Sequence, residues 1–117
     1  MKAKKYLILV VVLILSLTTM GMQAVATSPR YIKLVYQPQT QTLSVTILHF
    51  SPAVKVHYVY KVDVLKNGNP DGTHLYTSQP KFFFYTYTYN VTATTGDQLT
   101  VTAYCSLFGK LTRSITI

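Results

Sequence analysis

The sequence predicts an all-β domain of seven antiparallel strands in two packed sheets, a β sandwich, preceded by an apolar leader. Downstream of the leader, apolar and polar residues alternate with a period of two, which is the pattern of strands with one buried face. Turn signals recur roughly every 8–12 residues, as is typical of a sandwich or barrel. No window there has apolar residues at helical spacing. We therefore expect one domain, residues 27–117, with one core.

The leader has the three-part plan of an export signal. Lysines form a positive start, an uncharged apolar run follows over residues 6–17, and small side chains end the segment. Signal peptidases accept small residues at the −3 and −1 positions, so we expect a cleavable signal peptide, residues 1–26, cut after Ala26. A rival interpretation keeps the segment as an N-terminal membrane helix, because no charge occurs between Lys5 and Arg30 and about 20 apolar residues can cross a bilayer.

The charge pattern argues against nucleic-acid binding. The chain has a formal net charge of +8, with 11 Lys and Arg residues against three Asp residues. A nucleic-acid-binding protein normally gathers its cations on one face or helix, whereas here they fall singly in separate predicted strands or turns. We interpret them as a solvated surface that discourages pairing at sheet edges.

The first three expected strands are closed by proline or by turn residues. The first covers residues 30–37 and ends at Pro38. The second covers residues 41–50 and places Leu43, Val45 and Ile47 on one face. The third covers residues 54–65, and its buried face is expected to carry Val54, Val56, Tyr58, Tyr60, Val62 and Val64.

Turn residues separate the remaining four strands. Residues 66–72 are rich in Asn, Gly and Pro and predict a hairpin connection to a short fourth strand, residues 73–77. The fifth strand, residues 81–92, is expected to turn inward the series Phe83, Tyr85, Tyr87, Tyr89 and Val91. The sixth, residues 98–106, is expected to bury Leu99, Val101, Ala103 and Cys105, and the seventh covers residues 110–117.

One stretch resembles a known architecture. Residues 96–105, GDQLTVTAYC, followed by an amphipathic terminal strand, resemble the last two strands of immunoglobulin-like, fibronectin type III-like and PKD-like domains. The resemblance implies a seven-stranded antiparallel immunoglobulin-like sandwich. The chain departs from the immunoglobulin pattern, because the third strand has no tryptophan, Cys105 has no partner, and Leu99 stands near the usual corner tyrosine. The resemblance therefore transfers no functional residue.

The residues that could support catalysis are few and scattered. His49, His57 and His74 are the only imidazoles, and pairing of the third and fourth strands would bring His57 toward His74. No further ligands stand at the fixed spacing of a zinc or copper site. We expect no catalytic residue, no metal and no cofactor, and we expect Cys105 to be a buried apolar side chain.

One tripeptide predicts a covalent modification. Asn90-Val91-Thr92 is an N-glycosylation acceptor, and the alternation of the fifth strand places Asn90 on the outward face. The sequence therefore predicts an exposed glycosylation acceptor at Asn90 and leaves its occupancy open.

These features leave two functions of different classes. The first is a structural or assembly subunit at the cell surface, a filament subunit joined by strand exchange. In it the first strand, with Tyr31, Lys33 and Val35, adds to the sheet edge of a neighbour. The second is a secreted adhesion module whose exposed aromatic rings bind carbohydrate or protein. A membrane-anchored envelope or virion protein follows only if the leader is retained. A retained filament-core helix of the type IV pilin kind is disfavoured, because the run lacks an early acidic residue.

Overall fold

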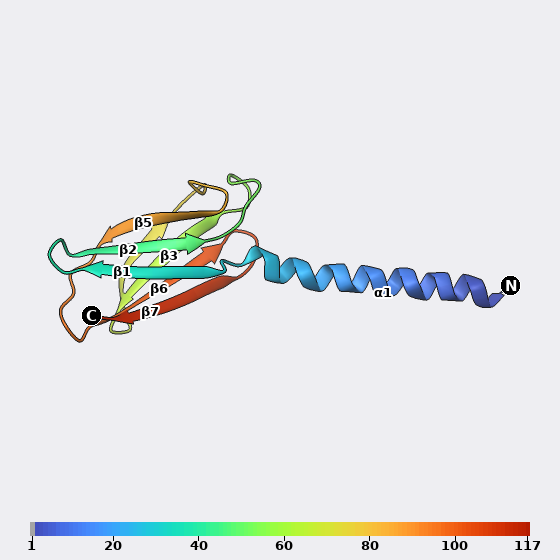
Figure 1. Cartoon of the computed structure of the whole chain (residues 1–117), viewed down its shortest axis with the longest axis horizontal. Coiled ribbons are helices and arrows are strands. Elements are labelled where there is room, and N and C mark those ends of the chain that lie inside the picture. Colours follow the sequence, from blue (N-terminus) through green and yellow to red (C-terminus); the bar gives the residue numbers. More distant parts are fainter. Residues whose placement is uncertain (1) are drawn as a thin grey trace.

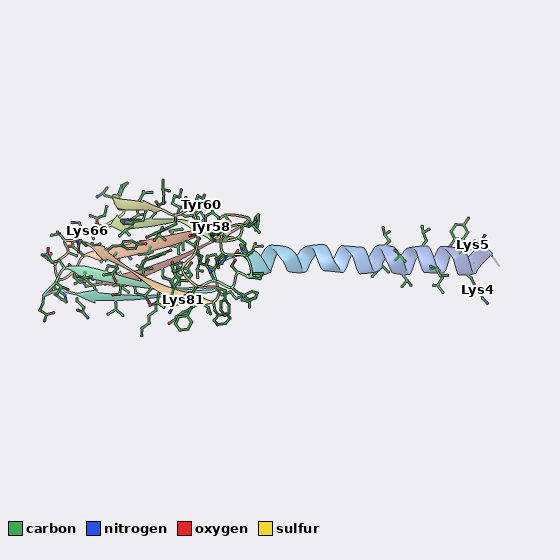
Figure 2. The ribbon with its side chains drawn as sticks, turned by 90° about the horizontal axis from the view of Figure 1, so that it is seen from above. Lys4, Lys5, Tyr58, Tyr60, Lys66 and Lys81 are labelled. Carbon is green, nitrogen blue, oxygen red and sulfur yellow. The ribbon has the colours of Figure 1, made fainter. Side chains whose placement is uncertain are left out.

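The computed structural model describes the backbone of residues 2–117 and the side chains of residues 3–14 and 27–117. Its first element, α1 (Lys2–Thr27), is a long helix that projects from one end of the β domain (Figure 1). Lys4 and Lys5 lie at the far tip of this helix (Figure 2). Ala26, the predicted cleavage point, stands in the last turn of α1, and its side chain lies outside those described.

The described apolar side chains of α1 are exposed. Residues 6–14 are all apolar or aromatic, and each exposes between 48% and 72% of its surface. A helix that is apolar all round needs an environment that covers it. Among the residues that the structure describes, no helix is both long and apolar enough to cross a membrane.

Within residues 2–117, seven antiparallel strands form two sheets that pack face to face (Figure 1), which confirms the predicted β sandwich. One sheet has the order β1-β2-β5, formed by β1 (Tyr31–Gln37), β2 (Thr42–Leu48) and β5 (Phe84–Asn90). The other has the order β4-β3-β6-β7, formed by β3 (Val59–Lys66), β4 (Asn69–Leu75), β6 (Gln98–Cys105) and β7 (Lys110–Thr116). This arrangement is compatible with an immunoglobulin-like fold.

The core lies between the two sheets and consists of alternate residues of the central strands. Leu43, Val45 and Ile47 of β2 are fully buried, as predicted. Each such side chain contributes about 1.5–3 kcal/mol by leaving water. From the facing sheet, β6 buries the predicted inward set of Leu99, Val101, Ala103 and Cys105.

The prediction for the first half of the third strand is wrong. β3 begins at Val59, and residues 52–58 form a loop of turns and bends. A register shift between Val59 and Lys61 then changes which residues face inward, because one extra residue moves a strand to its other face. Val59 is therefore buried, whereas Val56 is 68% exposed and the side chains of Tyr58 and Tyr60 are half-buried.

The β3–β4 turn is shorter than predicted. It consists of Asn67 and Gly68 alone, with φ of 53° and 79°, which is the geometry of a two-residue type I′ hairpin turn. β4 therefore begins at Asn69 and already contains Pro70. Proline is tolerated there because β4 is an edge strand, and the register shifts beside it.

The fifth strand also differs in length from the prediction. β5 starts at Phe84, so Phe83 precedes the strand and is 50% exposed, although it was predicted inward. The tyrosine series does point inward, since Tyr85 and Tyr89 are buried and Tyr87 is half-buried.

Candidate functional site

Three connections meet at the end of the sandwich from which α1 projects (Figure 1). They are the β2–β3 loop (residues 49–58), the β4–β5 connection (residues 76–83) and the β6–β7 turn (residues 106–109). We call this end the helix-proximal end. It contains the buried polar side chains His49, Ser51 and Gln79.

The last residue of α1 is fixed to this end by side-chain and backbone contacts. The carbonyl oxygen of Thr27 lies 2.8 Å from Nε2 of His49 and 3.3 Å from Nε2 of His57. Thr27 Oγ1 donates to the carbonyl of Phe108 at 3.1 Å. The helix is therefore joined to the domain by a defined junction and not by a free linker.

Gln79 is the hub of the polar groups beneath this junction. Its Nε2 donates to the carbonyls of His49 and Lys81, at 2.7 and 2.8 Å. Its Oε1 accepts from Val59 N–H at 3.3 Å and from Tyr85 Oη at 3.2 Å. The same oxygen lies 2.6 Å from Nδ1 of His49. Because two carbonyls fix the amide orientation, Nδ1 of His49 must carry a proton.

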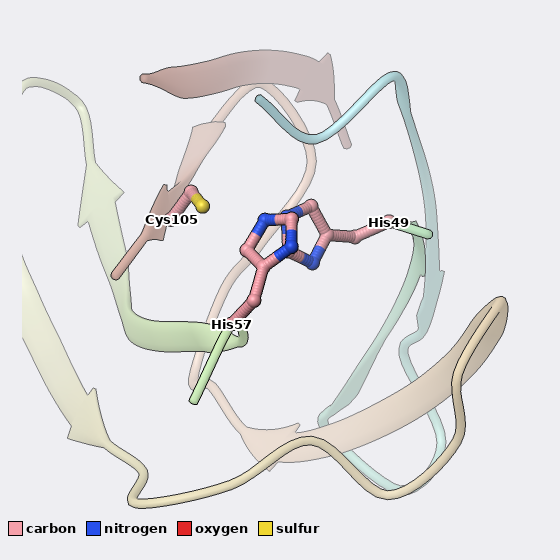
Figure 3. A group of neighbouring side chains, drawn as sticks. All are labelled: His49, His57 and Cys105. Atoms are coloured by element: carbon pink, nitrogen blue, oxygen red, sulfur yellow. The ribbon is translucent and has the colours of Figure 1, made fainter. Parts of the chain in front are cut away.

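The β2–β3 loop brings His57 back to His49. Ser51 Oγ donates to the carbonyl of His57, and the N–H of His57 donates to the carbonyl of Ala53 at 2.8 Å. The two imidazole rings then meet edge to face, with centroids 4.6 Å apart. Cys105, at the end of β6, points its sulfur toward them (Figure 3).

This grouping is the cluster of potential metal ligands within the part of the chain that the structure describes. One ligand atom from each of His49, His57 and Cys105 lies within 4.8 Å of the others. Sequence reasoning considered His57 with His74 instead. His74 lies in β4 and stacks on Tyr89, with centroids 3.8 Å apart.

One signal in the sequence could have predicted two of the three residues of this cluster. His49 continues the inward alternation of Leu43, Val45 and Ile47, and Cys105 continues that of β6. Both could therefore be placed at the inward end of a strand. The return of His57 depends on the fold of the β2–β3 loop, which has no local sequence signature.

Tyrosines fill the space between the open sides of the two sheets. Tyr76 Oη lies 2.7 Å from Tyr89 Oη, and the ring of Tyr76 stacks on that of Tyr87 at 4.2 Å. Burial raises the pKa of all four inner tyrosines above the ordinary value of 10: Tyr76, Tyr85, Tyr87 and Tyr89. Their hydroxyls therefore remain neutral, and they serve packing and hydrogen bonding.

Raising the pH above about 10 is expected to destabilise the domain, because unfolded tyrosines with an ordinary pKa lose their protons first. The unfolded state then binds fewer protons than the folded state, so the free energy of unfolding falls. Below pH 10 this stability is fully present. An absorbance titration should show four of the ten tyrosines ionising only as the circular dichroism signal is lost. Ionisation of all ten in a folded protein would contradict the result.

The other residues that the sequence singled out lie on exposed surfaces. Asn90 ends β5 and is exposed, as its outward position predicted, and its glycosylation stays a prediction. Tyr31, Lys33 and Val35 share the exposed face of β1, which is an edge strand of its sheet.

No protein-family model matches the chain, and no curated protein matches it significantly. The fold and the site therefore define the class of protein as an all-β sandwich with an N-terminal helix.

Proposed function

We propose that this protein is a non-catalytic, exported structural subunit that assembles at the cell surface by pairing strand edges of immunoglobulin-like domains. The observation that carries the proposal is the unprotected edge of β5. Domains of this size normally blunt such edges, because unpaired N–H and C=O groups attract further strands.

The four edge strands of the described sandwich differ in protection. β1 contains Lys33, and β7 contains Lys110 and Arg113. β4 contains Pro70 and a register shift. In contrast, the seven residues of β5, FYTYTYN, include no charge, no proline and no register shift against β2. The β5 edge is therefore the most receptive to an added strand.

β1 is suited to supply that strand. It occupies the edge of the same sheet opposite β5, so β1 of one molecule could pair with β5 of the next. Such a head-to-tail contact repeats without closing and forms a filament. Tyr36 keeps β1 in its own sheet, because its Oη donates to the carbonyl of Val91 at 2.6 Å and accepts from Ala93 N–H at 3.1 Å. Assembly then requires no unfolding.

The apolar leader supports export. Residues 6–14 of α1 are apolar or aromatic and exposed, and a membrane or the secretion machinery would cover such a surface during export. The intact mass of the native protein shows whether the leader is cleaved or retained. Loss of residues 1–26 identifies a signal peptide, whereas the full mass identifies an anchor and the membrane-bound alternative.

The substitution Thr88→Lys is expected to block assembly. Thr88 lies on the exposed face of β5 opposite Ser44, so a lysine there adds charge at the edge with little effect on the core. Light scattering and electron microscopy should show filaments for the wild type and monomers for this variant.

Thr95→Lys is the matched control for that experiment. Thr95 is exposed in the β5–β6 loop. The variant therefore adds the same charge at a position outside the β5 edge. Filaments should persist in this variant. Equal assembly by both variants would rule out the β5 edge.

A second function, adhesion, is favoured by an aromatic surface at the helix-proximal end. Five phenylalanines each expose at least half of their surface: Phe50, Phe82, Phe83, Phe84 and Phe108. Phe83 borders two hollows, one of about 690 Å³ along residues 80–86 and one of about 380 Å³ beside Arg30. Exposed aromatic rings often dominate contact energy with a partner protein or sugar. Under this function, Phe83→Ser would abolish retention on cell-wall glycan or partner protein and leave assembly unchanged.

A further inference from the structure

We propose that His49, His57 and Cys105 form a binding site for a transition-metal ion of the zinc or copper class. The site lies at the helix-proximal end, where β2, β6 and the junction with α1 meet (Figure 3). The proposal is independent of the assembly function, because none of the three residues lies on β1 or β5.

The donor set has the chemistry that these metals prefer. Two imidazoles and one thiolate suit zinc and copper, and they disfavour magnesium and calcium, which take oxygen ligands. The carbonyl oxygen of Thr27 lies 2.8 and 3.3 Å from the two histidine Nε2 atoms. It can therefore act as a fourth, weaker donor.

The distances fit a tetrahedral ion after a small adjustment. Zinc bonds of about 2.0 Å to nitrogen and 2.3 Å to sulfur place the donors about 3.3–3.6 Å from one another. The three ligand atoms lie within 4.8 Å of one another. Side-chain rotations that shorten the longest separation by about 1 Å would close the site around an ion.

The hydrogen bonds of Gln79 leave one ring nitrogen of His49 for the site. The two carbonyls bound by the Gln79 amide place its Oε1 against Nδ1 of His49, at 2.6 Å. Nε2 is then the ring atom of His49 that is available to an ion. Binding there requires the carbonyl oxygen of Thr27 to shift from its present position, 2.8 Å from Nε2.

Gln79 has the role that supports a metal-bound histidine. Ligand histidines usually donate their second ring N–H to an oxygen, which fixes the tautomer and the ring orientation. Oε1 of Gln79 is this oxygen, at 2.6 Å from Nδ1. His49 is fully buried, Cys105 is 5% exposed and His57 is half-buried, so the site is largely shielded from water.

A metal here would link parts of the chain that no disulfide can join. Cys105 is the only cysteine, so no bridge within the chain is available to staple the two sheets. His49 follows β2 of one sheet, and Cys105 ends β6 of the other. The ion would tie the sheets together beside the end of α1.

Cobalt(II) is the probe for this site, because it replaces zinc and its visible spectrum reports thiolate ligation. The full chain, kept soluble in mild detergent and treated with a chelator, is titrated with cobalt(II). We expect one equivalent to bind, with d–d bands of a four-coordinate ion and a thiolate-to-cobalt charge-transfer band that zinc abolishes. Zinc should also raise the melting temperature of the wild type.

Two ligand variants and one matched control complete the test. Cys105→Ala should lose the charge-transfer band, and both Cys105→Ala and His57→Asn should bind at least tenfold more weakly. His74→Gln, which removes an imidazole outside the cluster, should bind as the wild type does. Circular dichroism establishes that each variant is folded. Absence of stoichiometric binding by the wild type, or equal binding by folded Cys105→Ala, would overturn the proposal.

Discussion

Replacing Gln79 with leucine is expected to lower the free energy of unfolding by about 4 kcal/mol or more, because each buried polar group left unpaired costs about 1–3 kcal/mol. The amide of Gln79 satisfies the carbonyls of His49 and Lys81, the N–H of Val59 and the hydroxyl of Tyr85. Leucine has a similar volume but forms none of these bonds. The measurement is urea unfolding followed by circular dichroism.

The matched control is Gln98→Leu. Gln98 is exposed at the start of β6, so the same change there should alter stability by less than about 0.5 kcal/mol. If both variants lose the same stability, the helix-proximal end does not depend on the hydrogen bonds of Gln79.

Gly109→Ala is expected to lower the free energy of unfolding by about 2–4 kcal/mol, the sum of backbone strain and a steric clash. Gly109 has a φ of 89°, and a Cβ atom there would overlap Ser28 Oγ and approach Ser28 Cα to 3.3 Å. The backbone of Ser28 cannot rotate away as a long side chain would. The substitution should therefore push the end of α1 off the domain, and thermal unfolding measures the loss.

Gly96→Ala separates the two causes of that loss. Gly96 has a similar φ of 95°, but a Cβ atom there would meet nothing within 4 Å. This variant should lose only the conformational part, about 1–2 kcal/mol. Equal losses in both glycine variants would show that the contact with Ser28 contributes nothing.

Much of the sandwich could be predicted because strands with one buried face alternate apolar and polar residues. β2 and β6 each lie between two other strands of their sheet. Their inward residues are buried as predicted: Leu43, Val45 and Ile47 in β2, and Leu99, Val101, Ala103 and Cys105 in β6. The alternation of apolar and polar residues in these strands follows directly from the burial of one face. The inward tyrosines of β5 followed from the same rule.

The wrong predictions concern segments where the sequence pattern does not match the pairing of the strands. Residues 54–58 alternate as a strand does, yet they form a loop. Within β3, a register shift between Val59 and Lys61 changes the inward set. Local propensity cannot reveal such a bulge, since the partner strand decides it. The sequence predicts a longer turn, residues 66–72, because Pro70 also favours turns. On an edge strand, however, proline is compatible with pairing.

The helix-proximal cluster could not be predicted for a related reason. His49, His57 and Cys105 are separated by a loop and by most of the domain in the sequence. Only the packing of β2 against β6 and the return of the β2–β3 loop bring them together. Metal-ligand spacing is readable from a sequence when the ligands share one turn or hairpin, and here they do not.

Hydrogen exchange of assembled protein, compared with the Thr88→Lys monomer, tests the edge-pairing account most directly. We predict that assembly protects backbone amides of β1 and β5 while those of β4 and β7 exchange as in the monomer, since new main-chain hydrogen bonds form only at the paired edges. Protection confined to α1 or to the phenylalanines of the helix-proximal end, with β5 unchanged, would contradict the account.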